Sequence, residues 1–264
     1  MSRIASWRRS SGSRPLILGH RGVRPVIARH GNIEHADPRG LLPPENTLPA
    51  FERALAEGAD GIELDVRRCA TGEVVVMHDA DLARMTNERD LRAIADVTWP
   101  ELSRIDLGGA TAPLLSDVLA WARGAGLRVN IELKHDDPDH LGLAREVAKI
   151  LDRQPNPTSW LIASSFHPRL LLLLRVMFPQ IATAWLIHEG QQKNKPWFWA
   201  RFAPFDAVHA EHSIMPKTIA SCLDSRMVAA WTVNDISIAK SLSHAGSDVL
   251  ITDVPALLRE ALEA

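Results

Sequence analysis

The sequence has little of what disulfide-rich, zinc-binding and membrane-spanning proteins depend on. Two of its 264 residues are cysteines, Cys69 and Cys222, which lie far apart and in no spacing typical of a metal site. We expect both to be free thiols in a reducing cytosol. The longest apolar run, the leucines of residues 170–174, lies between two arginines and is far too short to cross a bilayer.

The amino terminus and the charge balance exclude further classes. Residues 1–14 are basic and rich in serine but lack the apolar segment of a secretion signal. We therefore expect a loose tail and a cytoplasmic protein without a transmembrane segment. Thirty basic residues stand against 32 acidic ones, a formal net charge of −2. General nucleic-acid binding needs a strongly basic surface, so no nucleic-acid partner is expected.

Short apolar runs recur along the whole chain. Apolar residues make up 46% of it, which is enough for a sizeable buried core. The runs are apolar on both faces rather than alternating, as in a parallel sheet that is covered on both sides. We predict strands at residues 15–19, 61–66, 128–133, 160–165, 182–187, 206–211, 227–232 and 248–252.

Helical patterns separate these runs. One begins beside Asn46 and Thr47, which are candidate caps, and stops at Gly58. The others cover residues 114–126, 137–153, 234–246 and 254–264. Repeated strand–helix alternation predicts an α/β protein with a (β/α)8 TIM barrel, and a doubly wound open sheet is the main alternative. Residues 15–264 would then form a single domain.

Two connections are longer than a plain barrel needs. Residues 23–44 form an enlarged loop after the first strand, rich in Pro, Arg, His and Gly. Residues 67–112 follow the second strand and contain an extra, hairpin-like strand at 73–79 and a short turn at 98–102. Long connections at the carboxyl ends of barrel strands usually carry the functional site.

Acidic side chains occur where buried strands should hide apolar ones. Glu63 and Asp65 share one face of the second strand, because alternate residues of a strand point to the same side. Glu132 and Lys134 repeat this pattern on the third strand, and Glu45 lies at a helix start. Carboxylates gathered in one volume repel each other and need a cation. Oxygen ligands suit Ca²⁺ or Mg²⁺ better than zinc, and Mn²⁺ is also compatible, so we predict one divalent cation.

Groups that can hold and cleave an anion surround the predicted metal site. His20 and Arg21 follow the first strand, and His78 ends the extra strand. A hard cation together with Arg21 and Lys134 makes a receptor for an anion, and phosphate fits because arginine matches its oxygens bidentately. Two imidazoles can divide acid and base work near neutral pH. The residues alone therefore predict metal-assisted cleavage of a phosphate ester.

These motifs, in this order, resemble the glycerophosphodiester phosphodiesterase family. The matching segments are HRG at 20–22, PENT at 44–47, ELD at 63–65, HD at 78–79 and ELK at 132–134. The resemblance spans roughly residues 15–257. It implies a TIM barrel that hydrolyses glycerophosphodiesters, its small-molecule partners, to an alcohol and glycerol 3-phosphate with a divalent cation.

The resemblance also implies a role for each matching residue. The metal ligands would be Glu63, Asp65, Glu132 and, at the metal or beside it, Glu45. The acid–base pair would be His20 and His78. The residues around the substrate would be Arg21 on the phosphate, Lys134 close to the phosphate or the metal carboxylates, and Trp231 beside the glycerol pocket.

The enlarged loop leaves the substrate open. Family members usually join HRG to PENT by a handful of residues, whereas 22 residues separate Gly22 from Glu45 here. Aromatic and basic residues also alternate over 193–205, which fits either a packed loop or a peripheral contact with a membrane interface or acyl chains. With such a contact, the substrate could be a lysophospholipid, cleaved by a lysophospholipase D-type activity.

Two other functions match part of the pattern. A lyase that stabilises an enolate with Mg²⁺ also places carboxylates at successive strand ends, but the pairing of HRG with a later HD speaks against it. A non-catalytic phosphoester- or lipid-binding barrel predicts a broken site, and no expected residue is missing.

His209 and Glu211 share a face of the sixth strand and stay outside the predicted site, and Asp253 is expected to cap the last helix. The oligomeric state stays open.

Overall fold

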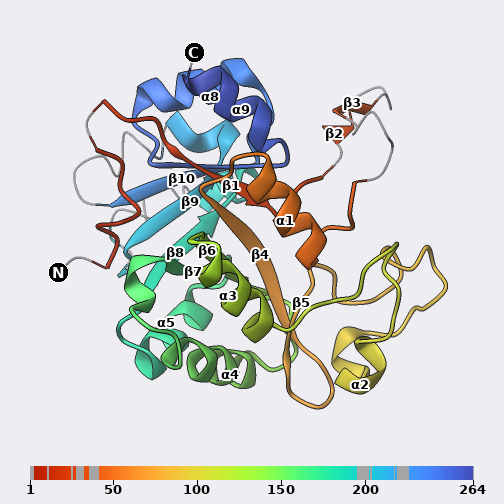
Figure 1. Ribbon diagram of the computed structural model, residues 1–264. Coiled ribbons are helices and arrows are strands. Elements are labelled where there is room, and N and C mark those ends of the chain that lie inside the picture. Colours follow the sequence, from red (N-terminus) through yellow and green to blue (C-terminus); the bar gives the residue numbers. More distant parts are fainter. Residues whose placement is uncertain are drawn as a thin grey trace.

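A closed barrel of parallel strands forms the centre of the molecule. The computed structural model describes residues 3–263 except 11, 25, 28–32, 36–41, 195–201, 203, 217 and 219–225. Within these residues, eight parallel strands pair in sequence order, and the first closes the circle by pairing with both its neighbours (Figure 1). They are β1 (Leu16–His20), β4 (Gly61–Arg68), β6 (Arg128–Leu133), β7 (Leu161–Ser165), β8 (Ala182–Ile187), β9 (Ala207–Glu211), β10 (Met227–Trp231) and β11 (Val249–Thr252). The predicted TIM barrel is confirmed, and the open sheet is excluded.

Helices cover the outside of the barrel, as the apolar character of both strand faces requires. They are α1 (Leu48–Ala56), α3 (Leu115–Gly124), α4 (His140–Asp152), α5 (Pro168–Met177), α8 (Ile236–Ala245) and α9 (Pro255–Glu263). Short 3₁₀ turns are η1 (Ile94–Asp96), η2 (Pro157–Ser159), η3 (Glu189–Asn194) and η4 (His212–Ile214). The leucines of 170–174 belong to α5, a helix that the sequence patterns did not predict. None of the helices in the described part of the chain is long and apolar enough to span a membrane.

Polar side chains fix several of the helix starts. The Asp139 carboxylate accepts a hydrogen bond from the Gly142 amide at the start of α4, and Asp235 accepts one from Ile238 at the start of α8. Thr47 stands at the cap position of α1 but donates its hydroxyl to the Pro44 carbonyl, so it does not cap the helix with its side chain.

Both enlarged connections contain strands. The loop after β1 carries a small antiparallel ribbon, β2 (Val26–Ile27) and β3 (Ile33–His35). The connection after β4 adds β5 (Val74–Val76) antiparallel to β4, followed by η1 and the short helix α2 (Trp99–Leu102), on one side of the barrel (Figure 1). Apolar side chains such as Met77, Leu82 and Leu102 give this lobe a small core of its own. The predicted hairpin-like strand is therefore confirmed.

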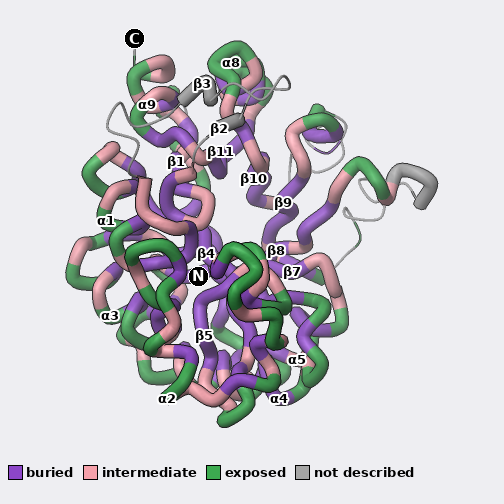
Figure 2. The backbone as a smooth tube through the Cα atoms, turned by 90° about the vertical axis from the view of Figure 1, so that its right-hand side faces the viewer, coloured by how far each residue is buried: buried purple, intermediate pink, exposed green. Residues whose placement is uncertain are grey.

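The barrel interior combines alanines with larger apolar side chains such as Leu18, Ile162 and Met227. Interior positions include Ala184, Ala207 and Ala229, which leave room above them for polar side chains at the carboxyl ends of the strands. The strands are the most continuously buried part of the backbone (Figure 2).

The amino-terminal segment departs from the expected loose tail. Ile4 is 4% exposed, Trp7 is fully buried, and both join the apolar cluster inside the barrel. Arg128 donates to the Ser6 carbonyl, and the Arg9 amide donates to Asp248. Both partners stand at the amino ends of strands, so this segment closes the barrel at the end opposite its mouth. The basic, serine-rich composition of the segment did not indicate this packing, because only two apolar side chains, Ile4 and Trp7, make the contact with the barrel interior.

Candidate active site

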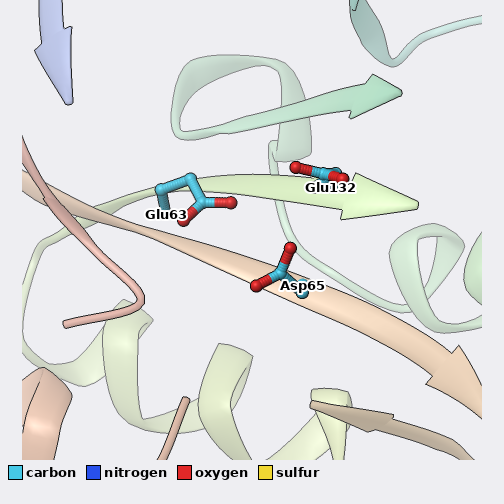
Figure 3. A group of neighbouring side chains, drawn as sticks. All are labelled: Glu63, Asp65 and Glu132. Atoms are coloured by element: carbon cyan, nitrogen blue, oxygen red, sulfur yellow. The ribbon is translucent and has the colours of Figure 1, made fainter. Parts of the chain in front are cut away.

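Three buried carboxylates meet at the carboxyl ends of β4 and β6. One oxygen from each of Glu63, Asp65 and Glu132 lies within 4.8 Å of the others. The strand register explains this, because Asp65 is paired with Glu132 on the neighbouring strand and Glu63 lies two residues before Asp65 (Figure 3). The three side chains predicted to share one volume therefore do so, and their oxygens are the donors that hard divalent cations prefer.

Two basic side chains neutralise part of this acidic cluster. The Lys134 ammonium lies 2.9 Å from Glu132 and 3.3 Å from Asp65, and the Arg21 guanidinium lies 3.2 Å from Asp65. Burial alone would raise the pKa of Asp65, but Lys134 and Arg21 lower it below its usual range. Burial, together with the charges of Asp65 and Glu132, raises the pKa of Glu63 well above its ordinary value.

Asn46 also holds Asp65, through two hydrogen bonds. Its amide nitrogen donates to the Asp65 carboxylate at 2.8 Å, and its amide oxygen accepts from the Asp65 backbone at 3.2 Å. Arg21 and Asn46 both have positive φ, 55° and 59°, and the Asn46 amide donates to the Arg21 carbonyl. A positive φ is unfavourable for residues other than glycine and persists only where neighbouring contacts impose it. Here this backbone conformation turns the side chains of Arg21 and Asn46 toward the acidic cluster.

His20 is bonded to a residue that sequence reasoning placed elsewhere. Its Nδ1 lies 2.7 Å from an oxygen of Asp253, whose other oxygen accepts from the Asn234 amide at 2.7 Å. Asp253 follows β11, which pairs with β1, and that pairing brings it to His20. The expectation that Asp253 caps the last helix is thus wrong, because both of its oxygens are used at the site.

His78 has a carboxylate partner of its own. Its Nδ1 lies 2.6 Å from one oxygen of Asp79. The other oxygen of Asp79 accepts a hydrogen bond from Arg84 Nε at 2.6 Å. The buried Arg67 guanidinium donates twice to the His78 carbonyl, at 2.7 and 2.9 Å. Arg67 thereby fixes the backbone of His78 and does not pair with the acidic cluster on its own strand.

Glu45 lies at the centre of an arginine cluster. Its carboxylate contacts Arg21 at 2.9 Å, Arg24 at 2.9 Å and Arg84 at 2.7 Å. Burial opposes ionisation, but these arginines lower the pKa of Glu45. Among the residues that the structure describes, Glu45 is not part of the acidic group that could hold a metal ion. It reaches that group only through Arg21.

One pocket joins these groups to an apolar wall. It encloses about 550 Å³ of empty space, its open mouth included. One side is charged, and Phe166, Leu186, Trp231 and Ile251 line the other. The rings of Phe166 and Trp231 meet edge to face at 5.5 Å, and the Trp231 indole donates to the His209 carbonyl. The described lining residues are His20, Arg21, Glu63, His78, Asn130, Glu132, Lys134, Phe166, Leu186, Trp231 and Ile251.

The other sequence features lie beside the pocket or outside the described residues. His209 is buried in the barrel, and Glu211 accepts a hydrogen bond from the Glu189 amide. Neither belongs to the described pocket lining. Of the aromatic–basic segment 193–205, most residues, Trp197 and Trp199 among them, lie outside the described part of the chain.

Counted with every carboxylate ionised and both histidines neutral, the site carries more negative than positive charge. Six carboxylates stand against four cationic side chains among the described residues, an excess of two negative charges. The carboxylates are those of Glu45, Glu63, Asp65, Asp79, Glu132 and Asp253. The cations are Arg21, Arg24, Arg84 and Lys134. A divalent cation would balance this excess.

A TIM barrel whose mouth combines such an acidic cluster with two imidazoles, a guanidinium and an ammonium belongs to the class of phosphoric diester hydrolases. The family model for the glycerophosphoryl diester phosphodiesterase family matches residues 20–257. The chain belongs to this family.

Individual relatives agree with the family model. A glycerophosphodiester phosphodiesterase of Bacillus altitudinis is 33% identical over 80% of this chain and 90% of its own length. The crystal structure of a glycerophosphodiester phosphodiesterase from Thermotoga maritima is 27% identical, with a TM-score of 0.71 over 94% of this chain and 98% of that one. An Oleispira antarctica phosphodiesterase, determined in complex with the product sn-glycerol-3-phosphate, is 22% identical, with a TM-score of 0.77 over 95% of this chain and 98% of that one.

Proposed function

We propose that the protein hydrolyses glycerophosphodiesters to an alcohol and glycerol 3-phosphate, with a divalent cation and with His20 and His78 as the acid–base pair. One observation carries the proposal. Two imidazoles, each bonded to its own carboxylate, and an acidic cluster suited to a cation line the same pocket. The product complex of the Oleispira relative supports the choice of glycerol 3-phosphate as the product.

The residues present fit a divalent cation. Glu63, Asp65 and Glu132 would hold it, since each offers an oxygen within 4.8 Å of the others and the site has an excess of two negative charges. The oxygen donors are compatible with Ca²⁺, Mg²⁺ or Mn²⁺. A cation bound there would supply positive charge beside the phosphate oxygens and so favour the charge that develops during attack.

Arg21 and Lys134 orient the phosphate in this proposal. Both line the pocket. Both also form ion pairs with carboxylates of the cluster, which hold the guanidinium and the ammonium near the cation site. Guanidinium and ammonium groups bind phosphate oxygens through charge-assisted hydrogen bonds. A diester held by these groups lies between the two histidines.

The carboxylate partners set the direction in which each imidazole works. Asp253 and Asp79 take the Nδ1 side of His20 and His78, which leaves Nε2 of each ring for the substrate. One histidine removes a proton from the attacking hydroxyl group as the new P–O bond forms. The other gives a proton to the alcohol oxygen as the old P–O bond breaks. If the attacking group is water, this step gives glycerol 3-phosphate directly. If it is a hydroxyl of the glycerol moiety, the step gives a cyclic phosphate, which water then opens to glycerol 3-phosphate with the roles of the two histidines exchanged.

A turnover assay tests the proposal. Hydrolysis of glycerophosphocholine should be abolished by EDTA and restored by Ca²⁺, Mg²⁺ or Mn²⁺. His20→Ala and His78→Ala should each lower kcat by about 10²-fold or more with an unchanged circular dichroism spectrum. His244→Ala, an exposed histidine of α8 bonded only to the Lys240 carbonyl, is the matched control. Full turnover in EDTA, or near-normal kcat in either site variant, contradicts the proposed mechanism.

A further inference from the structure

The pocket lining contains a neutral amide whose oxygen has no protein partner. Asn130 lies on β6, two residues before Glu132, and its register partner on β4 is Glu63. Its side chain is 1% exposed, it lines the pocket, and its Oδ1 has no hydrogen-bond partner in the protein. Buried amide oxygens almost always have partners, so an unpartnered one on a residue that lines a cavity points to a ligand.

Two more uncharged polar side chains lie on the interior side of the barrel. Ser164 and His209 are on β7 and β9, on the interior side that they share with Ile162 and Ala207 two residues earlier. The Ser164 hydroxyl and both His209 ring nitrogens also lack protein partners. Burial lowers the pKa of His209 to about 3, so its imidazole is neutral at physiological pH. These polar side chains lie on the interior side of an otherwise apolar barrel, and they carry no charge.

No other neutral side chain of the described pocket lining is available to a hydroxyl group, apart from the two imidazoles proposed for acid–base work. Among the described lining residues, the remainder are charged groups, imidazoles bonded to aspartates, and apolar side chains. The Trp231 indole is already bonded to the His209 carbonyl. A hydroxyl group that entered the apolar side would lose its bonds to water and gain none in return.

We propose that Asn130 recognises a free hydroxyl group of the glycerol moiety and so selects substrates that carry glycerol. A hydroxyl both donates and accepts, and an amide does the same, so the two are complementary. An anion would instead be drawn to Arg21 and Lys134, and a cation to the carboxylates. The inference rests on the proposed function, because it assigns one part of that substrate to one residue of the same pocket.

The first test compares a substrate with and one without glycerol. Asn130→Ala should lower kcat/KM for glycerophosphocholine by about tenfold or more, because a site built to bond a hydroxyl discriminates through that bond. For bis(p-nitrophenyl) phosphate, which has no glycerol, the change should stay below about threefold. Ile162→Val, which removes one methylene from the neighbouring interior position, is the matched control for packing. Equal losses on both substrates, or no loss on either, overturn the inference.

A second test does not depend on turnover. Calorimetry should show that the wild type binds glycerol 3-phosphate more tightly than n-propyl phosphate, which lacks both hydroxyls, and that Asn130→Ala abolishes this preference. If the wild type cleaves neither diester, the proposed function fails while this binding test still decides the inference. A wild type without the preference, or an Asn130→Ala variant that keeps it, overturns the inference. If Asn130→Ala does not fold, Asn130→Ser replaces it, because the serine side chain is shorter than that of asparagine and its hydroxyl does not reach the glycerol.

Discussion

At the scale of single residues, the site works through pairs. Three side chains that the sequence predicted for the site each have a partner that holds them: His20 has Asp253, His78 has Asp79, and Asp65 has Asn46. That Asp65 shares a volume with Glu63 was predictable because alternate residues of a strand share a face. Asp253 was not, because its role depends on β11 closing the barrel against β1, a contact between chain ends.

The Asp253–His20 pair gives the first residue-scale prediction. Asp253→Asn keeps the shape of the side chain but removes the charge that orients the imidazole and stabilises its protonated form. We expect kcat for glycerophosphocholine to fall by about 10²-fold with little change in KM. Asp235→Asn is the control, since asparagine also serves as a helix cap at that position. Similar kcat values for the two variants would show that Asp253 does not orient His20.

The buried His209 gives a prediction about pH and stability. Its folded-state pKa of about 3 lies below the ordinary value of 6.5, so the unfolded chain binds a proton that the folded chain refuses. Stability is therefore fully present above about pH 6.5 and falls as the pH drops toward 3, by up to about 1.4 kcal/mol per pH unit for this group alone. His209→Gln should flatten the decline of Tm between pH 6.5 and 4.5. An unchanged slope would mean that His209 is protonated in the folded protein.

At the scale of elements, the lobe after β4 brings its own residues to the site. Arg84 belongs to this lobe and reaches Glu45 in front of α1, so one guanidinium joins two long connections at the mouth. The sequence placed His78 on an extra strand correctly. It did not reveal Arg84, because no periodicity relates a residue of one loop to a residue of another.

Loss of the Arg84 bridge should reduce activity more than stability. Arg84→Met removes the contacts to Asp79 and Glu45 while Glu45 keeps Arg21 and Arg24. We expect kcat/KM to fall by about tenfold, because Asp79 is then free to move with His78. The Tm should change little, since the arginine is half exposed. Arg89→Met, in the same lobe and bonded only to the Thr86 carbonyl, is the control, and equal kinetics for both variants would contradict the bridge.

At the scale of the whole molecule, the two ends of the barrel have different tasks. The carboxyl ends of the strands hold charged residues around an open pocket, whereas the amino ends are closed by an apolar plug. The alternation of strands and helices was enough to predict the barrel and the end that carries the site. The plug was not predicted, because a single buried tryptophan in a basic segment has no periodic pattern.

This division of tasks predicts that stability and activity can be changed separately. Trp7 is fully buried among apolar side chains of the interior, and Arg128 and Asp248 bind its segment at the far end from the pocket. Trp7→Ala should therefore cost about 3–5 kcal/mol of unfolding free energy and lower the Tm by about 10 °C, as expected for truncation of a buried aromatic residue. At 25 °C the kcat should stay within about twofold of wild type, because no pocket residue moves. Arg8→Ala, an exposed change in the same segment, should leave both quantities unchanged. If Trp7→Ala has the same Tm as Arg8→Ala, residues 3–10 do not contribute to stability and form a loose tail. If Trp7→Ala loses kcat in proportion to its loss of stability, the two ends of the barrel are coupled.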